Sequence, residues 1–359
     1  MKEMTVSLAG DADLIIGVDT HLDTHTAAIC DGRGRAVARL RAPATAAGYA
    51  QLRAWARSAA AGSRVIWAME GTRHYGLGLA RHLASQGEQV TEIGNTKRVG
   101  KRRAGTSDAI DAVRAARELR ARPHPAQMRA DGDREALRLL MIDRDNAITS
   151  AKTARTALAA VWVTAPAPLR DRLRHLPRQR RARECAALTC PPGADRQTRV
   201  LHQTLIRLGQ RIATLAGVAA ELEAQIAQLV EEMAPGLVAA EPGFGALSAA
   251  QLLLSWSHAG RIRTEAAFAM LSGTAPVPVS SGRTDQHRLN RLGDRQLNRA
   301  LHMVAVTRMR CHPATLAYVQ RRRAEGKTDR EIRRCIKRYP ARHLYQALNK
   351  QLNQATQTT

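Results

Sequence analysis

Four acidic residues occupy positions from which their carboxylates could gather around one metal ion. Asp19 and Glu70 each end an apolar segment of strand character. Asp108 and Asp111 are three residues apart in a helical pattern, which puts both on one helix face. Clustered carboxylates repel one another unless a cation compensates them, and hard oxygen ligands suit Mg²⁺, with Mn²⁺ as the alternative, rather than zinc. The four acids therefore predict a magnesium site that could act on a phosphodiester bond.

Each of these acids also has a plainer structural interpretation. The two strand-end acids would simply begin surface loops, and Asp108 would be a helix N-terminal acid that the helix dipole favours. The nearby His21, Asp23 and His25 invite a histidine metal site. In an extended chain, however, they would share an exposed face at a strand end, and we predict no ligand role for them. The combination of four acids with a basic chain favours metal binding.

The chain carries a large excess of positive charge. Its 359 residues include 56 Lys and Arg against 31 Asp and Glu, which gives a formal net charge of +25 and a pI near 11.3. A field of this sign favours polyanionic partners, above all nucleic acid. Aromatic residues make up only 3% of the chain, which argues against platforms for base stacking and favours contacts to the phosphate backbone.

A membrane surface is also polyanionic, but the sequence has no apolar segment suited to crossing a bilayer. The longest charge-free stretches, residues 242–260 and 266–282, are interrupted by Pro, Gly, Ser, Gln and His. The first residues lack the pattern of a signal peptide, and the five cysteines form no CxxC pair. We therefore expect a cytoplasmic protein with neither a disulfide framework nor a zinc ribbon.

The order of strand and helix patterns predicts a mixed α/β domain over residues 11–125. Three short apolar segments in meander order precede a helix, a buried-type strand, a second helix, a short strand, a basic stretch and a third helix. The expected elements are strands at 14–19, 26–30, 36–40, 64–70 and 89–93, and helices at 46–61, at 75–86 and from near Ser107 onward.

The rest of the chain is mainly helical in pattern. Residues 134–163 and 199–233 predict two long helices that pack as an antiparallel hairpin, within a helical coiled-coil region at 126–235. The proline-rich segment 164–195 between them cannot be one helix and is expected to be a basic connection. Residues 236–350 predict a further, mainly α domain.

Three motifs around the acids resemble one known family. Ile16-Gly-Val-Asp19-Thr-His, Glu70-Gly-Thr-Arg-His-Tyr75 and Ser107-Asp-Ala-Ile-Asp111-Ala are similar to the motifs of the DEDD transposases of the insertion sequence 110 group. The resemblance implies a RuvC-like N-terminal domain with an RNase H fold. Two departures, Ser107 in place of the family's usual Thr and the stretch after Glu70, leave the acidic residues themselves unchanged.

A loop rich in Pro and Ser at residues 273–282 interrupts the last region and resembles the family's second block. In that block a Gly-x-x-Pro turn precedes a Ser-Gly pair, and the serine is the recombination nucleophile. Alignment on Pro276 makes Ser281 the matching residue, with Ser280 as a neighbour that the motif alone does not exclude. Without the resemblance, the same serines would be a polar loop.

Basic and glycine-rich segments complete the expected nucleic-acid contacts. The turn before residue 246 resembles a helix-hairpin-helix turn, although a helix C-cap glycine explains it equally well. The basic residues after the serine loop recur at roughly helical spacing, which suits phosphate contacts or a solvated helix face. The candidate nucleic-acid-binding residues are Lys97, Arg98, Lys101, Arg102, Arg103, Gly243, Gly245, Arg283, Arg288, Arg291, Arg295 and Arg299.

The resemblance implies a recombinase that excises and inserts a mobile element. Its family partners are donor DNA, target DNA and a noncoding bridge RNA, and its sites are shared between the subunits of a dimer or tetramer. One alternative is a Holliday-junction nuclease that uses the same acids to activate water, without a covalent protein intermediate. Another is a noncatalytic nucleic-acid-binding protein that has lost its metal.

Overall fold

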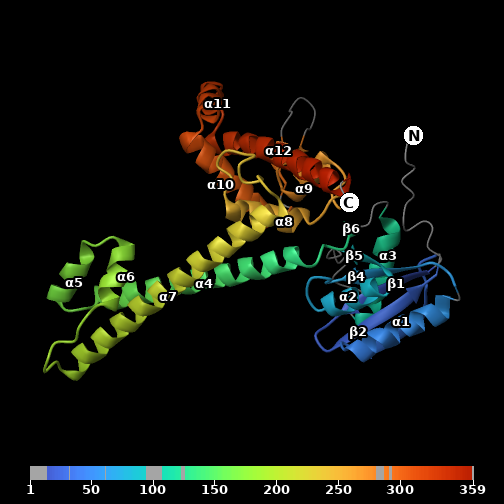
Figure 1. The fold of residues 1–359 in the computed structure, drawn as a ribbon, viewed down its shortest axis with the longest axis horizontal. Coiled ribbons are helices and arrows are strands. Elements are labelled where there is room, and N and C mark those ends of the chain that lie inside the picture. Colours follow the sequence, from blue (N-terminus) through green and yellow to red (C-terminus); the bar gives the residue numbers. More distant parts are fainter. Residues whose placement is uncertain are drawn as a thin grey trace. The chain divides into compact units, whose positions relative to one another are not determined.

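The computed structural model describes residues 14–31, 33–60, 62–93, 107–122, 126–279, 287–290 and 293–357 (Figure 1). These residues form two compact units, the first ending at Arg129 and the second beginning at Ala130. Serine-loop residues Ser280 and Ser281 lie outside the described residues, as do several basic candidates. Those basic residues are Lys97, Arg98, Lys101, Arg102, Arg103, Arg283 and Arg291.

A six-stranded mixed sheet forms the first unit, and the sequence predicts five of its strands. Its strands are β1 (Leu14–Thr20), β2 (Thr24–Cys30), β3 (Ala36–Pro43), β4 (Val65–Glu70), β5 (Gln89–Ile93) and β6 (Ala126–Gln127). They are arranged in the order β3-β2-β1-β4-β5-β6. The β1–β4 and β4–β5 pairs are parallel, whereas β1–β2, β2–β3 and β5–β6 are antiparallel. The short strand β6 has no counterpart in the sequence prediction.

Helices cover both faces of this sheet. Residues of β1 and β4 alternate in direction: Ile16 and Trp67 pack against α1 (Ala46–Ala60) and α2 (Leu77–Ser85) in one apolar cluster. Ile15 and Ile66 pack against α3 (Asp108–Ala121) in a second cluster. Burial on both faces explains why β4 reads as a continuous apolar run.

The second unit begins with two long helices, α4 (Asp133–Val163) and α7 (Arg196–Met233). Leu137 shares a cluster with Ile226 and Val230, Arg144 donates to Glu223, and Leu158 shares another cluster with Leu205. Rising numbers on one helix therefore meet falling numbers on the other, which confirms the predicted antiparallel hairpin. A regular coiled-coil geometry along this hairpin stays a prediction.

The connection between these helices contains regular structure that the sequence interpretation omitted. Two short helices, α5 (Ala167–Arg174) and α6 (Arg178–Ala186), each begin directly after a proline, Pro166 and Pro177. Proline is favourable at a helix start because its fixed φ suits the first turn and its missing N–H is not needed there. Leu173 and Cys185 are buried in one apolar cluster with residues of α4 and α7, so the connection packs as part of the unit.

The second unit also contains α8 (Ala246–Trp256), an apolar helix, and four further helices. They are α9 (Glu265–Leu271), α10 (Arg295–Cys311), α11 (Pro313–Ala324) and α12 (Asp329–Gln357). Residues of α9, α10 and α12 share one apolar cluster with α8. A two-stranded antiparallel sheet, β7 (Pro276–Pro278) with β8 (His287–Leu289), stands where the sequence suggested an irregular loop. Among the helices the structure describes, none is long and apolar enough to cross a membrane.

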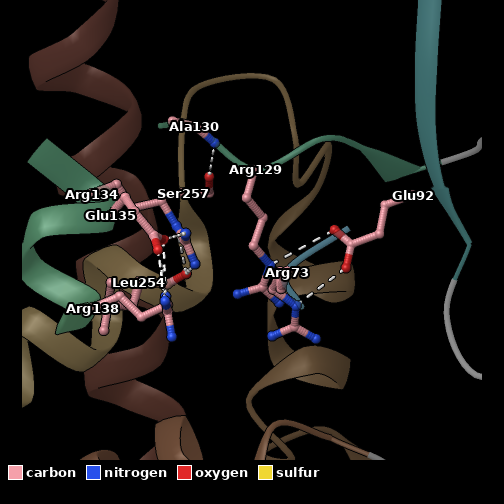
Figure 2. Close-up of polar contacts among 9 residues, drawn as sticks. All are labelled: Arg73, Glu92, Arg129, Ala130, Arg134, Glu135, Arg138, Leu254 and Ser257. Atoms are coloured by element: carbon pink, nitrogen blue, oxygen red, sulfur yellow. Dashed lines mark hydrogen bonds and ion pairs between the residues drawn. The ribbon is translucent and has the colours of Figure 1, made fainter. Parts of the chain in front are cut away.

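Polar contacts hold the residues on each side of the Arg129–Ala130 boundary, and each contact lies within one unit (Figure 2). In the first unit, the Glu92 carboxylate lies 3.4 Å from the Arg73 guanidinium and 3.8 Å from that of Arg129. In the second unit, the Ala130 N–H donates to the Ser257 hydroxyl at 2.8 Å. Nearby, the buried Arg134 donates to the Leu254 carbonyl at 3.0 Å. The boundary residues are thus held by polar contacts within their own units.

A glycine in β1 sets how closely α3 approaches the sheet. A Cβ added at Gly17 would lie 1.8 Å from the Ala112 carbonyl oxygen and 2.7 Å from the Ala116 nitrogen. Both obstructing atoms belong to the backbone of α3, so no side-chain rotation could relieve the overlap. Gly17 therefore allows the Ala112–Ala116 segment of α3 to pack directly on the middle of β1.

Replacing Gly17 with alanine should push α3 away from the sheet. Overpacking of this kind typically costs about 1–3 kcal/mol, and a backbone obstacle places Gly17→Ala at the upper end. Hydrogen exchange followed by mass spectrometry should show faster exchange in peptides of β1 and α3. Gly217→Ala is the matched control, because an added Cβ there meets nothing within 4 Å. It should stabilise α7 by about 0.5–1 kcal/mol. Unchanged exchange in the Gly17 variant would contradict the packing argument.

Candidate metal centre and nucleic-acid interface

Two of the four acids end neighbouring parallel strands. Val18 on β1 pairs with Met69 on β4, so Asp19 and Glu70, one residue further along each strand, reach the same edge of the sheet. The Thr20 hydroxyl donates to the Glu70 carbonyl oxygen at 2.9 Å and ties the two strand ends together. Both acids are half-buried.

The other two acids lie in the first turn of α3. Ser107 caps this helix, with its hydroxyl accepting from the Ile110 N–H at 3.4 Å, and Asp108 and Asp111 follow. The helix dipole favours carboxylates at this end, as the plainer interpretation of Asp108 assumed. Asp111 also forms an ion pair with Arg114, whose Nη1 lies 2.5 Å from its Oδ1.

The His21 ring, which the sequence interpretation did not count as a ligand, lies close to both Asp19 and Asp108. The His21 Nε2 atom lies 3.1 Å from Asp19 Oδ2 and 3.5 Å from Asp108 Oδ1. One ligand atom from each of Asp19, His21 and Asp108 falls within 4.8 Å of the others. Glu70 and Asp111 are not members of this group. The structure therefore brings two of the predicted acids together and adds a histidine.

The prediction that placed His21 and His25 on one exposed face is wrong. β1 ends at Thr20 and β2 begins at Thr24, so the chain turns back at His21, where its N–H donates to the Thr24 carbonyl. This turn places the His21 ring by Asp19. His25 instead lies within β2, is fully buried and stacks on Tyr49 with ring centroids 5.6 Å apart. Burial lowers the pKa of His25, which favours a neutral ring.

The electrostatics of Asp19 suit a bound cation. Burial raises the pKa of its carboxyl above the ordinary value, and the Asp108 and Asp111 carboxylates raise it further. Opposing this rise, His21 lowers it by its charge and its hydrogen bond. A divalent ion would remove the repulsion between these carboxylates, and their oxygen atoms are the ligands that Mg²⁺ and Mn²⁺ accept. The donor set therefore fits such an ion.

A cavity of about 400 Å³ adjoins Asp108, and two arginines that the sequence interpretation did not single out line it. Arg39 and Arg41 are exposed and belong to the edge strand β3. The Arg41 guanidinium donates to the Thr24 hydroxyl at 3.1 Å. Thr26 and Ser107 also line the cavity. Cations beside a carboxylate cluster suit a phosphate that must approach it.

Four of the nucleic-acid candidates belong to described parts of the second unit, and their surroundings differ. Gly243 adopts φ +78, and a Cβ added there would come within 3.2 Å of the Thr307 side chain, so this glycine serves the packing of the turn on α10. An added Cβ at Gly245 meets nothing within 4 Å. Arg295 and Arg299 are exposed on α10.

Arg288, the remaining described candidate, is exposed on β8. Residues 279–286, which include Ser281, connect β7 to β8. The serine prediction itself rests on the sequence.

Two family models match this chain. One, a DEDD transposase model described as "Transposase", matches residues 16–163. The other, described as "Transposase IS116/IS110/IS902 family", matches residues 237–320. The first match spans the acidic cluster, and the second spans α8 to α10 together with the β7–β8 hairpin.

One curated relative is similar over a shorter stretch. The "Insertion element IS110 uncharacterized 43.6 kDa protein" of Streptomyces coelicolor is 40% identical over 111 residues, which represent 30% of this chain. The match covers only 27% of that relative's length.

Proposed function

We propose that this chain is an IS110-type insertion-sequence transposase, which cuts and exchanges DNA strands to excise and insert a mobile element; the two family matches and the similarity to an IS110 protein support this. The observation that carries the proposal is the meeting of Asp19 and Asp108 at one edge of the sheet. Two acids 89 positions apart come together there beside a cavity lined by arginines.

The metal-binding residues of this proposal are Asp19, Glu70, Asp108 and Asp111, with Mg²⁺ as the ion and Mn²⁺ as its substitute. When bound, such an ion offsets the negative charge that builds up on a reacting phosphodiester. His21 holds the Asp19 carboxylate in place through its 3.1 Å hydrogen bond. The Thr20 hydroxyl keeps the two strand ends at a fixed separation, which preserves the spacing of the acids.

The proposed nucleophile is Ser281. Its hydroxyl oxygen forms a bond to phosphorus while the bond from phosphorus to the neighbouring sugar oxygen breaks. The serine loses one proton and the departing sugar hydroxyl gains one, so the step is balanced in protons. The phosphoserine ester conserves the energy of the phosphodiester bond, which a second strand can recover by attacking the ester.

A bridge RNA and a second subunit complete the proposal. The RNA would pair with donor and target DNA, and the net charge of +25 suits a protein that holds several nucleic-acid strands. The serine of one subunit would meet the acids of another, with the α4–α7 hairpin as the oligomerisation element. Light scattering of the purified protein with and without RNA tests this part. A monomer under recombining conditions would contradict it.

Strand exchange by the purified protein tests the proposal as a whole. The protein, its co-purifying RNA, Mg²⁺ and end-labelled donor DNA are mixed, and a protein–DNA adduct is sought that protease removes. Peptide mapping should place the adduct on a serine of residues 279–286. Recombinant DNA formed without any adduct would overturn the serine mechanism, and EDTA-resistant recombination would overturn the metal centre.

Arg39 should hold a phosphate of the DNA close to Asp108. Arg39→Gln should weaken DNA binding and reduce the slope of log affinity against log salt by about 0.9, the value for one lost phosphate contact on duplex DNA. The measurement is a salt titration followed by fluorescence anisotropy. Arg33→Gln is the control: residue 33 is exposed in the β2–β3 turn, at the sheet edge opposite Asp19. Equal effects of the two variants would contradict the assignment.

A further inference from the structure

A cavity of about 890 Å³ lies in the second unit between the β7–β8 hairpin and helices α11 and α12. Seven cationic side chains line it, against one carboxylate, Glu331. Some of these cations have acidic partners: Arg322 pairs with Glu325, and Arg338 and Arg342 pair with Glu265. The cavity nevertheless keeps a strong excess of positive charge.

One of these cations, Lys337, is buried in the wall of the cavity. It lines the cavity, yet only 6% of its surface is exposed, and its ammonium donates to the amide oxygen of Asn298 at 3.1 Å. Among the residues that the structure describes, no carboxylate forms an ion pair with Lys337, and its neighbour Arg334 interacts with Glu331 through charge alone. Burial lowers the pKa of Lys337, and the Arg334 charge lowers it further. A buried, uncompensated ammonium at a cavity wall is stabilised when an anion enters.

The cavity is aromatic as well as basic, because two tyrosines line it. Tyr318 and Tyr339 both line it, with their rings edge to face and their centroids 6.2 Å apart. Tyr339 is 50% exposed, so its ring is accessible to a ligand. The chain has only five tyrosines, and two of them meet beside this cluster of cations. Aromatic rings combined with cations are typical of sites that stack a base and hold its phosphate.

Hydrogen bonds connect Lys337, in the wall of the cavity, to the turn that leads into β7. Asn298, the partner of Lys337, also donates through its amide nitrogen to the Ser272 carbonyl at 2.7 Å. Gly273 follows at φ +66, and a Cβ added there would lie 2.8 Å from that amide nitrogen. The same side chain therefore supports both the buried lysine and the entry to the β7–β8 hairpin.

We infer that this cavity binds a single-stranded segment of polynucleotide, with a phosphate at Lys337 and Arg334 and an unpaired base on Tyr339. Its volume falls within the range of ligand pockets, which suits a few nucleotides rather than a duplex. The inference rests on the proposed function, because it places an unpaired strand next to the hairpin whose connecting segment contains Ser281. DNA and RNA share the required chemistry, and the test separates them.

Binding of labelled oligonucleotides to the full chain tests this inference. The probes are a single-stranded DNA, a single-stranded RNA of the same sequence and the corresponding DNA duplex, followed by fluorescence anisotropy without divalent ions. Tyr339→Leu should weaken single-strand binding by about 5- to 150-fold, while Tyr339→Phe retains it. Arg334→Gln should reduce the salt slope for single strands by about 0.7. The single strand that loses more affinity in Tyr339→Leu identifies the natural occupant.

Control variants separate a loss of binding at the cavity from a general loss of charge or of folding. Arg330→Gln removes an exposed cation of α12 that does not line the cavity, and it should bind single strands like the wild type. Lys337→Gln should weaken binding too, and thermal melting shows whether that variant is folded. Unchanged single-strand binding in Tyr339→Leu and Arg334→Gln would overturn the inference, as would an equal loss for the duplex. Adduct formation by the wild type, measured separately, reports on the proposed function alone.

Discussion

Replacing Asp19 with asparagine should reduce DNA cleavage by about a thousandfold. Losing a carboxylate ligand removes several kcal/mol of charge stabilisation from a metal-assisted reaction, and every 1.36 kcal/mol corresponds to a tenfold change in rate. Asp19 has the central position in the cluster, since His21 contacts it and the Asp108 and Asp111 charges act on it. Cleavage of end-labelled donor DNA under single-turnover conditions measures the effect. Wild-type cleavage by this variant would exclude the metal centre.

In the absence of metal, Asp19→Asn should stabilise the folded protein rather than weaken it. The pKa of Asp19 is raised in the folded protein, so folding favours its protonated form. Without metal, Asp19 therefore lowers the free energy of unfolding as pH rises from its ordinary pKa through the raised one, and it remains destabilising above that window. At neutral pH in EDTA, Asp19→Asn should melt at or above the wild-type temperature. Added Mn²⁺ should stabilise the wild type and leave the variant unchanged, whereas equal stabilisation of both would place the ion elsewhere.

Ser281→Ala should abolish both the protein–DNA adduct and strand exchange. Removing the nucleophile of a serine enzyme lowers turnover by on the order of a millionfold. The folded structure and metal binding should be unchanged, because the acids belong to the first unit. A denaturing gel with labelled DNA detects the adduct.

Ser280→Ala provides the matched control for the nucleophile. It changes the adjacent hydroxyl by the same single oxygen, and it should keep adduct formation and recombination. If Ser281→Ala still cut DNA strands in a metal-dependent way, the protein would be a nuclease of the Holliday-junction type. If strand exchange survived Ser281→Ala and vanished in Ser280→Ala, the nucleophile would be Ser280.

The elements with strong periodicity could be predicted from the sequence. The apolar runs that form β1 and β4 and the long Ala/Leu patterns of α4 and α7 depend on burial alone, and the structure places them within a few residues of their expected bounds. The meeting of Asp19 with the helix containing Asp108 was also predictable. Acids at strand ends and at a helix start share one edge when the helix packs on that strand.

Features that depend on turns and on distant contacts could not be predicted in the same way. His21 was misplaced because the pattern alone did not show where β1 ends, and one residue of turn reverses the face that a side chain occupies. Arg39 and Arg41 became relevant only when β3 and the start of α3 lined a common open cavity. Low aromatic content suggested no stacking site, since composition cannot show that two tyrosines meet in space.

The α4–α7 hairpin has a consequence for how this kind of protein could change in size. Its 31-residue helix α4 spans about 46 Å, with the α5–α6 pair packed near one end and α8 near the other. Removing seven residues from each helix at matching positions would shorten this distance by about 10 Å and keep the helix faces in phase. Paired deletions of this kind would therefore change the distance between the two ends of the hairpin while leaving the residues that pack at each end unchanged.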